Sequence, residues 1–444
     1  MNPTSKIFFW SLSAALGGFL FGFDTAVISG VEKYLQTLWH LTPLEHGLTV
    51  SIALIGTVAG ALFGGIPADL LGRKKALLLV AVIYLIAALG TALAHDWWFF
   101  LIFRLLGGIG VGISSIVAPL YITEIAPPRK RGRLVATFQF NIVFGILMAY
   151  LSNYLLSGVD PAHSWRWMLG VQAIPSLFFI LTVFIIPESP RWLILKKNRI
   201  QEARQTLEII DPAEADKTIA AIVNSADKKT SAGKFADVFN KTYRTPLMLA
   251  VLFALFNQVS GINAIIYYAP RIFEMAGLGK ESALLSSAGI GLVNLLSTFL
   301  GLALIDKYGR KTLMIIGSAG LILSLALVTQ AFYRGEGGIV VPVYLFMFIA
   351  FFAFSQGAVI WVFIAEIFPN EVRAYGQTIG SSTHWVMAAL ISFSFPMITE
   401  TFGGAAAFGF FTLMMVCQFI FAWKIMPETK GKTLEDMDTI IISH

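Results

Sequence analysis

Two opposite charges fall inside apolar segments that are long enough to cross a membrane. Asp24 lies about six residues from the outer end of the run 7–30, and Arg104 lies about seven residues into the run 97–120. At 1.5 Å per residue both lie roughly 9–10 Å deep, so a pair between them is geometrically reasonable. A carboxylate beside a guanidinium can bind and release a proton if the guanidinium lowers its pKa in one state and retreats in another. The alternative is a static structural ion pair.

Uncharged amides and aromatic rings occur at mid-depth in the later apolar segments. Amides both donate and accept hydrogen bonds, and Trp rings cover the apolar C–H face of a sugar, so the set suits a neutral polyhydroxyl ligand. A charged substrate would require a counter-charge, and none occurs at this depth. Any one amide could instead join neighbouring helices. The candidate set in the second half is Asn257, Gln258, Asn263, Tyr267, Asn294, His384 and Trp385, and Gln139 adds an amide from the first half.

The elements that position these residues are predicted to be membrane-spanning helices. The chain of 444 residues is 57% hydrophobic and only 13% charged, whereas a soluble domain carries about 25% charged residues. The first apolar run is too long for a signal peptide. Runs of about 20 apolar residues occur at 7–30, 47–67, 76–94, 97–120, 134–156, 166–186, 246–269, 282–304, 312–332, 340–365, 374–397 and 404–426. We therefore predict an all-α integral membrane protein with twelve transmembrane helices.

The basic residues indicate the orientation of these spans. Of the 32 Lys and Arg residues, 26 fall at the N-terminus, in alternate loops or in the tail, all on one side of the membrane. The positive-inside rule makes that side cytoplasmic. We expect both termini in the cytoplasm of a plasma membrane, a bacterial inner membrane in particular. The net charge of +6 is then a topology signal, and a nucleic-acid partner is not expected.

Three motifs repeat in the two halves at an offset of about 240 residues. Transporters built from two parallel six-helix repeats bind substrate near the midplane, so the repeat predicts two pseudo-symmetric bundles. The expected regions are a bundle at 1–186, a cytoplasmic helical linker at 187–245, a bundle at 246–426 and a tail at 427–444. The repeated motifs are Asp69–Lys74 with Asp306–Lys311, Glu124–Pro127 with Glu366–Pro369, and Pro187–Ser189 with Pro427–Thr429.

The linker is charged and amphipathic. Gln201–Ile210 and Pro212–Ala226 are predicted as short helices, with Asp211 as the N-cap of the second. The linker could brace the two bundles or serve only as a tether.

Several site classes find no support in the sequence. Gly431-Lys432-Thr433 is similar to the end of a Walker A motif, but Met426 occupies the required glycine position, so ATP drive is not expected. No metal or nucleophile signature occurs, and we expect no cofactor, no metal and no enzymatic activity. The single Cys417 excludes an internal disulfide and is expected to be a small buried apolar residue.

The chain resembles the sugar porter branch of the major facilitator superfamily over almost its whole length. The segments that carry the resemblance are Gly22–Gly30, Asp69–Lys74, Arg104 with the Gly-rich run after it, Pro119–Glu124, Pro187–Trp192, Gln258–Asn263, Asp306–Lys311, Glu366–Arg373 and Pro427–Lys430.

The resemblance implies roles for particular residues. It implies sugar contacts by Gln139, Gln258, Asn263, Asn294 and Trp361, and less directly by Asn257, Tyr267, His384 and Trp385. Asp24 and Arg104 match the proton-coupling pair of bacterial xylose–proton symporters. A cytoplasmic charge network that stabilises the outward-facing state is implied for Arg73, Glu124, Arg131, Arg310, Glu366 and Arg373.

The predicted function is import of a monosaccharide, hexose or pentose, coupled to protons by alternating access in a monomer surrounded by the lipid bilayer. The alternatives are an uncoupled sugar uniporter, a membrane sugar sensor and a membrane enzyme. Many relatives have Pro at the position of Ala358, and Gln or Asn at that of His384. The choice among glucose, xylose, galactose and fructose stays open.

Overall fold

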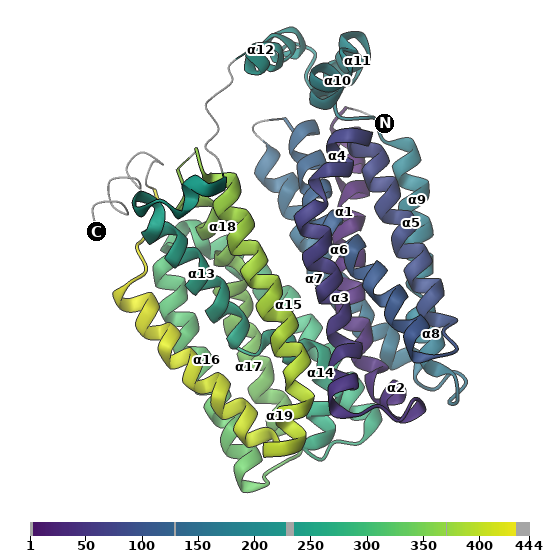
Figure 1. Cartoon of the computed structure of the whole chain (residues 1–444), viewed down its shortest axis with the longest axis vertical. Coiled ribbons are helices and arrows are strands. Elements are labelled where there is room, and N and C mark those ends of the chain that lie inside the picture. Colours follow the sequence, from purple (N-terminus) through teal and green to yellow (C-terminus); the bar gives the residue numbers. More distant parts are fainter. Residues whose placement is uncertain (1–2, 128–129, 228–234, 370, 432–444) are drawn as a thin grey trace. The chain divides into compact units, whose positions relative to one another are not determined.

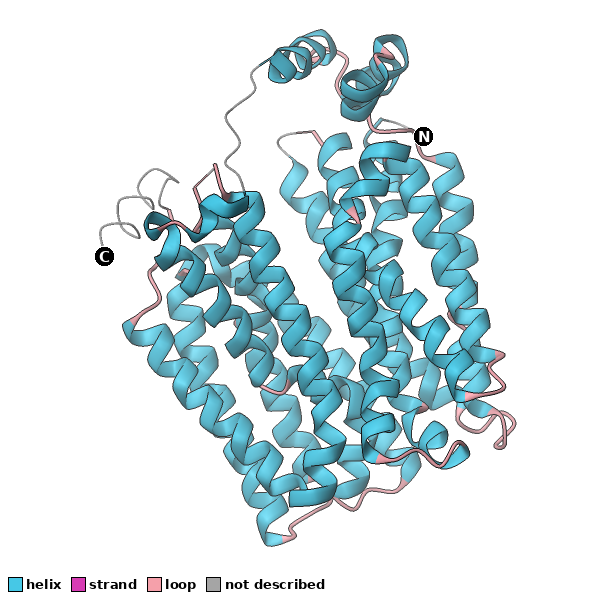
Figure 2. Cartoon of the chain, viewed as in Figure 1, coloured by secondary structure: helices cyan, strands magenta, loops and turns pink. Residues whose placement is uncertain are grey.

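Every regular element in the described part of the chain is a helix (Figure 2). The computed structural model describes residues 3–127, 130–227, 235–369 and 371–431. Parts of the predicted linker (228–234) and tail (432–444) lie outside these ranges. The chain divides into two compact units, Met1–Val27 with Ile52–Thr230 (unit 1) and Ile28–Ser51 with Ser231–His444 (unit 2).

Unit 1 is a helical bundle followed by three short helices. Within it α1 packs along α7 and α6, and α5 packs against α6 and α9 (Figure 1). Its helices are α1 (Pro3–Val27), the second half of α3 (Pro43–Phe63), α4 (Gly65–Leu71), α5 (Arg73–Ala92), α6 (Trp97–Ile125), α7 (Arg131–Leu156), α8 (Ser164–Gly170), α9 (Ala173–Ile185), α10 (Pro190–Lys197), α11 (Ile200–Ile210) and α12 (Ala215–Asp227).

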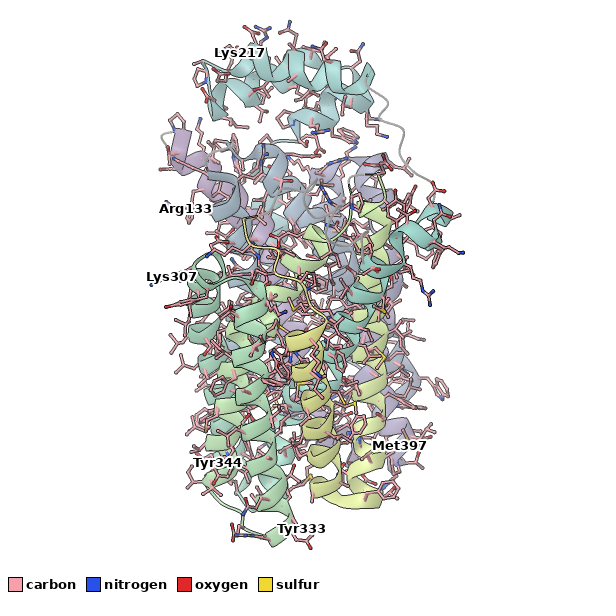
Figure 3. The ribbon with its side chains drawn as sticks, turned by 90° about the vertical axis from the view of Figure 1, so that its left-hand side faces the viewer. Arg133, Lys217, Lys307, Tyr333, Tyr344 and Met397 are labelled. Carbon is pink, nitrogen blue, oxygen red and sulfur yellow. The ribbon has the colours of Figure 1, made fainter. Side chains whose placement is uncertain are left out.

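Unit 2 is a second helical bundle in which α16 packs against α17 and α19. Lys307, near the end of α15, and Tyr333, near the end of α16, lie at opposite ends of this bundle (Figure 3). Its elements are η1 (Ile28–Gly30), α2 (Glu32–Leu38), the first half of α3, η3 (Phe235–Phe239), η4 (Lys241–Tyr243), α13 (Arg244–Val259), α14 (Ile262–Met275), α15 (Lys280–Tyr308), α16 (Arg310–Arg334), α17 (Val340–Phe354), α18 (Gln356–Glu366) and α19 (Arg373–Lys424).

The described residues contain eleven helical segments that are long and apolar enough to cross a membrane. The last of them, Arg373–Lys424, has 52 residues, or about 78 Å at 1.5 Å per residue, far longer than a hydrocarbon core of about 30 Å. Gly403 interrupts it with φ 80° and ψ 168°, between the predicted spans 374–397 and 404–426. Counting these two spans separately gives twelve, as the sequence predicts.

Large apolar side chains on the bundle surfaces indicate contact with lipid. On α9 the exposed residues Ile174, Leu177, Phe178, Leu181 and Phe184 recur at helical spacing along one face. In water such a stripe would be unfavourable, since burying each side chain is worth about 1.5–3 kcal/mol. Cys417 is likewise exposed on α19, so the expectation that it is buried is wrong.

Glycines allow α3 and α6 to approach each other closely in unit 1. A Cβ added at Gly60 would lie 2.3 Å from the carbonyl oxygen of Ile109, and one at Gly108 would lie 1.9 Å from that of Ala53. Gly56 and Gly112 face backbone atoms in the same way. Each helix thus presents two glycines four residues apart to the other, a spacing that allows close helix packing.

The three short helices after α9 form their own apolar cluster. Trp192, Leu193, Ala203, Leu207 and Ile219 are its buried members. Helix α11 begins one residue earlier than predicted, and α12 begins at Ala215.

Asp211 is the C-cap residue of α11, so the prediction that it is an N-cap is wrong. Its extended backbone ends α11, and the turn 211–214 separates it from α12.

We expect Gly60→Ala to lower the free energy of unfolding by about 1–3 kcal/mol, because its methyl group would collide with rigid backbone and separate α3 from α6. Thermal unfolding in detergent measures the change. Gly65→Ala is the matched control, since a Cβ there meets nothing within 4 Å. Equal stability of the two variants would contradict the packing role.

Candidate functional site

Asp24 and Arg104 form a buried ion pair inside unit 1. Nη1 of Arg104 donates to Oδ1 of Asp24 at 2.9 Å, and the two residues are 2% and 5% exposed. Removing one partner of such a pair costs about 3–5 kcal/mol, because the other charge is left buried. The side chains reach each other from α1 and α6, as their equal predicted depth suggested.

In unit 2 the predicted span 246–269 is divided into two helices. Helix α13 ends at Val259, α14 begins at Ile262, and Gly261 between them has φ 87°. Residues other than Gly pay about 1–2 kcal/mol in this left-handed region. A Cβ at Gly261 would also lie 2.5 Å from the ring of Phe411. The Ser260 hydroxyl bridges the break, since it donates to the carbonyl oxygen of Asn257 at 2.6 Å and accepts from the backbone nitrogen of Ile262 at 3.3 Å. Interrupted helices of this kind line binding sites in transporters.

The amides around this break form one hydrogen-bonded cluster. Gln258 Nε2 donates to Oδ1 of Asn257 at 2.9 Å, and Asn263 Nδ2 donates to Oε1 of Gln258 at 2.7 Å. Gln258 Nε2 also lies 3.2 Å from the ring nitrogens of His384, a contact suited to a neutral imidazole that accepts. Nδ2 of Asn257 has no partner among the described residues, so a ligand hydroxyl could satisfy this buried donor.

Two tryptophans flank the same cluster. The ring centroid of Trp361 lies 4.8 Å from that of His384, and Trp385 follows His384 directly with a centroid distance of 4.9 Å. Trp361 is 39% exposed, whereas His384 is only 8% exposed. The partly exposed indole of Trp361 offers an apolar face, and the neighbouring amides offer hydrogen-bond donors and acceptors. A sugar ring requires both kinds of contact.

Three further predicted sugar contacts lie on α7, α14 and α15. Asn294 is half-buried on α15, and Tyr267 is buried on α14. Gln139 is half-buried on α7 of unit 1. Their assignment stays a prediction.

At one end of unit 1 the repeated motifs form a compact charge cluster. Arg73 donates two parallel hydrogen bonds to Glu124, at 2.9 and 3.0 Å, and a third to Asp69. Glu188 accepts from the backbone nitrogens of Arg73 and Lys74 at 2.9 and 3.1 Å. The carboxylate thereby satisfies free N–H groups at the start of α5.

Unit 2 contains the same arrangement. Arg310 donates to Glu366 at 3.1 and 2.8 Å and to Asp306 at 3.3 Å, and Glu428 accepts from the backbone nitrogens of Arg310 and Lys311. The sequence repeat therefore encodes one structural motif used twice. Glu188 and Glu428 were visible in the repeated Pro-Glu pairs but were not predicted as members of the network.

Two predicted members of the network lie outside these ion pairs. Arg131 is exposed in the first turn of α7, and Nε of Arg373 donates to the carbonyl oxygen of Phe368 at 3.0 Å. Both lie seven residues after the glutamates of the motif, a spacing that does not bring them to Glu124 and Glu366 in the described structure.

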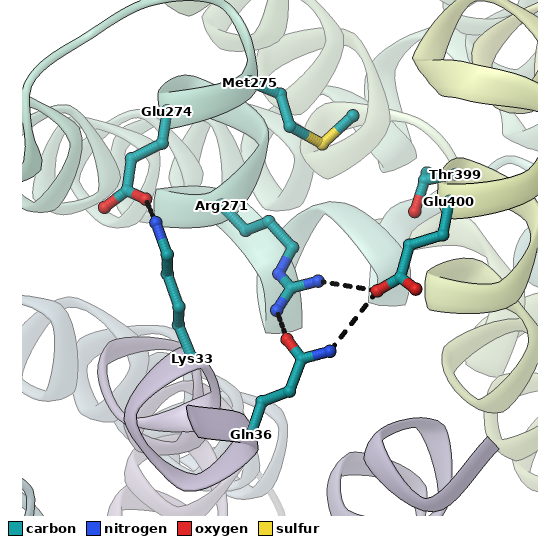
Figure 4. A pocket seen from close by; sticks show the side chains of 7 residues that line it. All are labelled: Lys33, Gln36, Arg271, Glu274, Met275, Thr399 and Glu400. Atoms are coloured by element: carbon teal, nitrogen blue, oxygen red, sulfur yellow. Dashed lines mark hydrogen bonds and ion pairs between the residues drawn. The ribbon is translucent and has the colours of Figure 1, made fainter. Parts of the chain in front are cut away.

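The sequence did not predict a second charge cluster in unit 2, between α2 and α14. Glu32, 1% exposed, lies 3.1 Å from Nε of Arg271 and 2.5 Å from Nε2 of His46. Arg271 also contacts Gln36 and Glu400, and all three line a pocket of about 460 Å³ (Figure 4). We call Glu32, Gln36, His46, Arg271 and Glu400 the α2–α14 cluster. In the sequence, these charged residues lie next to the ends of apolar runs, where charged surface residues are common. Their positions therefore gave no signal of a buried cluster.

The pKa values of two glutamates, the buried Glu32 and the half-buried Glu188, are shifted in opposite directions. Burial acts to raise the pKa of Glu32, but Arg271 and His46 more than offset it, so its pKa lies below the usual 4.5. Burial raises the pKa of Glu188, although the backbone donors of Ser189, Lys74 and Arg73 oppose the rise. Glu32 therefore depends on its charged partners.

Known proteins resemble this chain over nearly its full length. A family described as "Sugar (and other) transporter" matches residues 10–441. The D-xylose transporter of Levilactobacillus brevis is 37% identical over 434 residues, 96% of this chain and 94% of that protein. The arabinose–proton symporter of Bacillus subtilis is 38% identical over 438 residues, 97% and 94%. The inward-open xylose transporter XylE of E. coli superimposes with a TM-score of 0.88 at 33% identity, covering 98% of this chain and 100% of that one.

We expect Glu32→Gln to lower the free energy of unfolding at neutral pH by about 3 kcal/mol, because Arg271 would lose a buried partner. A carboxyl whose pKa is lowered by folding stabilises the fold above its unfolded pKa, and the effect is lost as the pH falls through the folded pKa. The stability difference between wild type and variant should therefore shrink below pH 4.5.

Thermal unfolding between pH 7 and pH 3.5 measures this difference. Glu336→Gln is the control, since Glu336 and Arg334 form an exposed pair worth at most about 1 kcal/mol. A difference for Glu32→Gln that stays constant down to pH 3.5 would contradict the prediction.

Proposed function

Because this chain belongs to the sugar transporter family, we propose that it imports a monosaccharide together with a proton, by alternating access in the membrane. The observation that supports proton coupling best is the buried ion pair of Asp24 with Arg104. A facilitator that only exposes a sugar site has no need of a titratable carboxylate paired in apolar surroundings, where each charge is costly. The relatives named as proton symporters of pentoses make the same coupling reasonable here.

The proton and the sugar are coupled through the state of this pair. Arginine side chains do not give up their proton in proteins, so Asp24 is the partner of the pair that takes up the proton in this proposal. A proton on Asp24 removes the attraction between α1 and α6 and leaves the guanidinium to find other partners. The binding of one proton thus changes which arrangement of the helices in unit 1 has the lower free energy.

The sugar binds at the amide cluster of unit 2. Asn257, Gln258 and Asn263 exchange hydrogen bonds with its hydroxyls, His384 orients the Gln258 amide, and Trp361 covers an apolar face of the ring. Gln139, Tyr267, Asn294 and Trp385 are further contacts on the resemblance alone. Pentoses are the first candidates because relatives are named for D-xylose and arabinose, and hexoses are the second.

The charge clusters stabilise one end of each bundle during this cycle. Arg73 with Glu124 and Arg310 with Glu366 hold their helices together, and Arg131 and Arg373 take part when the helices rearrange. The bundles 1–186 and 246–426 move as bodies, joined by the linker 187–245, with the tail after 427. The protein acts as a monomer in the lipid bilayer of a bacterial inner membrane, with both termini in the cytoplasm.

We expect Gln258→Ala to weaken sugar binding about 5- to 150-fold, the effect of losing about 1–3 kcal/mol when a sugar hydroxyl is left unpaired. Binding of D-xylose, L-arabinose and D-glucose to purified protein, followed by tryptophan fluorescence, measures the change. Gln418→Ala is the control, because Gln418 is an equally buried amide that accepts from Gln356 instead. Unchanged affinity in Gln258→Ala would place the sugar elsewhere.

We expect the wild type in proteoliposomes to take up protons from the outside when sugar is added, making the outer medium alkaline. Asp24→Asn should abolish this signal and uphill accumulation, while sugar exchange between the two sides continues, because the amide is neutral like a protonated carboxyl. Asp160→Asn is the control, since Asp160 is exposed near His163.

Each alternative function predicts a distinct result in the same vesicles. Sugar flux without alkalinisation in the wild type would indicate a uniporter. Sugar binding without any flux would indicate a sensor. Uphill accumulation by Asp24→Asn would contradict the role of the carboxylate.

A further inference from the structure

Two buried hydroxyls in unit 1, those of Tyr84 and Ser114, lack hydrogen-bond partners in the described structure. Tyr84 on α5 and Ser114 on α6 are both 0% exposed, and neither hydroxyl meets hydrogen-bond geometry with a described residue. A buried polar group without a partner costs about 1–3 kcal/mol, which Phe and Ala at these positions would avoid. Buried polar groups of this kind require an explanation, and a functional role is one of them.

The neighbours of these hydroxyls connect them to the ion pair. The Tyr84 phenol interacts with the charge of Asp24 and, loosely, with the Ser114 hydroxyl. Arg104 uses Nη1 for Asp24, whereas its Nε and Nη2 have no partner among the described residues. A carboxylate, a phenol, a hydroxyl and two free guanidinium donors thus share one apolar region of unit 1.

One face of α6 orders these groups along the bundle. Arg104, Gly107, Gly110 and Ser114 follow at spacings of three and four residues, so they share a face. A Cβ at Gly107 would lie 3.6 Å from Oδ1 of Asp24, and one at Gly110 would lie 3.6 Å from the Tyr84 ring. The ring of Tyr84 therefore lies between the ion pair and Ser114.

Helix α1 gives the direction of this path. A Cβ at Gly17 would lie 2.4 Å from the Ser114 hydroxyl, and Gly17 is seven residues before Asp24, or about 10 Å along the helix. Ser114 thus lies about 10 Å from the ion pair, toward the end of unit 1 where α5 begins with Arg73. By the distribution of basic residues that end is cytoplasmic.

We propose that Tyr84 and Ser114 complete the proton site: the Tyr84 phenol accepts a hydrogen bond from protonated Asp24, and Ser114 continues the path along which the proton leaves. This inference rests on the proposed proton coupling. Protonated Asp24 carries an O–H donor that needs an acceptor, and Arg104 has none to offer. A phenol oxygen accepts and its O–H donates, so Tyr84 can do both.

The transfer along this path balances. The O–H bond of the Asp24 carboxyl breaks as an O–H bond forms on the Tyr84 oxygen, the phenol's own proton passes to the Ser114 oxygen, and the proton of Ser114 passes to water. Each hydroxyl gains one proton and loses one. The net change moves one proton from Asp24 to water and restores the carboxylate that pairs with Arg104.

Two other helices packed against α1 are α9 and α11. Helix α9 (Ala173–Ile185) contains no titratable residue. Helix α11 carries Glu202 and Glu208, which are exposed, and Arg204, which pairs with Asp216. On α7, Asn153 donates to the carbonyl oxygen of Val27, which lies three residues after Asp24. Tyr150, three residues before Asn153, is therefore the buried titratable side chain of α7 nearest the level of Asp24. Arg104 and the Tyr84 hydroxyl are therefore the described groups that we place at the proton site.

The test compares Tyr84→Phe and Ser114→Ala with wild type in proteoliposomes over pH 5 to 8. Losing the acceptor for the protonated carboxyl makes protonation harder, so half-maximal proton-driven uptake by Tyr84→Phe should move to more acid pH by about one unit, equivalent to about 1.4 kcal/mol. Proton-driven uptake at pH 7 should fall about 10-fold. Sugar exchange, which needs no net proton release, should stay within about two-fold of wild type.

Tyr121→Phe is the matched control, because this phenol in the same bundle donates to the carbonyl oxygen of Pro187 and lies far along α6 from Asp24. It should keep the wild-type pH profile. Ser114→Ala should slow proton-driven uptake without removing exchange, and adding Ser114→Ala to Tyr84→Phe should change little further, since the path is already cut.

The outcomes separate this inference from the proposed function. A wild type that moves sugar without protons would overturn both. A wild type that couples normally, together with a Tyr84→Phe variant that keeps its pH profile and rate, would overturn only the role of the hydroxyls. If Tyr84→Phe cannot be purified folded, the rate and pH profile of Ser114→Ala decide.

Discussion

The attraction between one carboxylate and one guanidinium in apolar surroundings determines what unit 1 can do. Asp24 and Arg104 are each nearly inaccessible, and each makes the burial of the other tolerable. Because arginine does not give up its proton, the charge of the pair can change only if Asp24 binds a proton. In the proposed cycle, the helices that carry the two residues respond to protons through this pair.

Unit 2 contains a cluster of uncharged polar side chains instead of an ion pair in its interior. Its amide cluster lies where the chain leaves helical geometry at Gly261, so side chains from α13, α14 and α19 reach one place. Gln258 is held by three neighbours, which limits the rotamer freedom that a ligand would otherwise have to restrict. The resulting site is pre-organised but uncharged. In the transport cycle that we propose, charge sensing and ligand recognition are thus carried by separate units of one chain.

The ion pair and the centre of the amide cluster could be predicted from the sequence, because polar residues are rare within apolar membrane-spanning runs. Depth along apolar runs was enough to pair Asp24 with Arg104 and to group Gln258 with His384. The break at Gly261 was not predicted, because the hydrophobicity of an apolar run does not show whether the helix continues through it.

Other features depend on three-dimensional neighbours that no spacing rule supplies. The α2–α14 cluster joins residues from α2, α3, α14 and α19, which are far apart in the sequence. Arg131 and Arg373 share the spacing of the repeated motif, yet only Arg373 has a described hydrogen bond, to Phe368. Asp211 ends α11 and does not begin α12, because the turn 211–214 separates the two helices and α12 begins only at Ala215.

The two glutamates that cap α5 and α16 also bear on how the protein is made. Glu188 lies beyond the last span of the first bundle but binds the backbone at the start of an earlier helix, and Glu428 does the same in the second. Each bundle therefore receives its closing contact only when its last segment has been synthesised. On the ribosome, the first bundle can reach its finished form while the second is still being translated, which makes assembly sequential and limits wrong pairing between two similar halves.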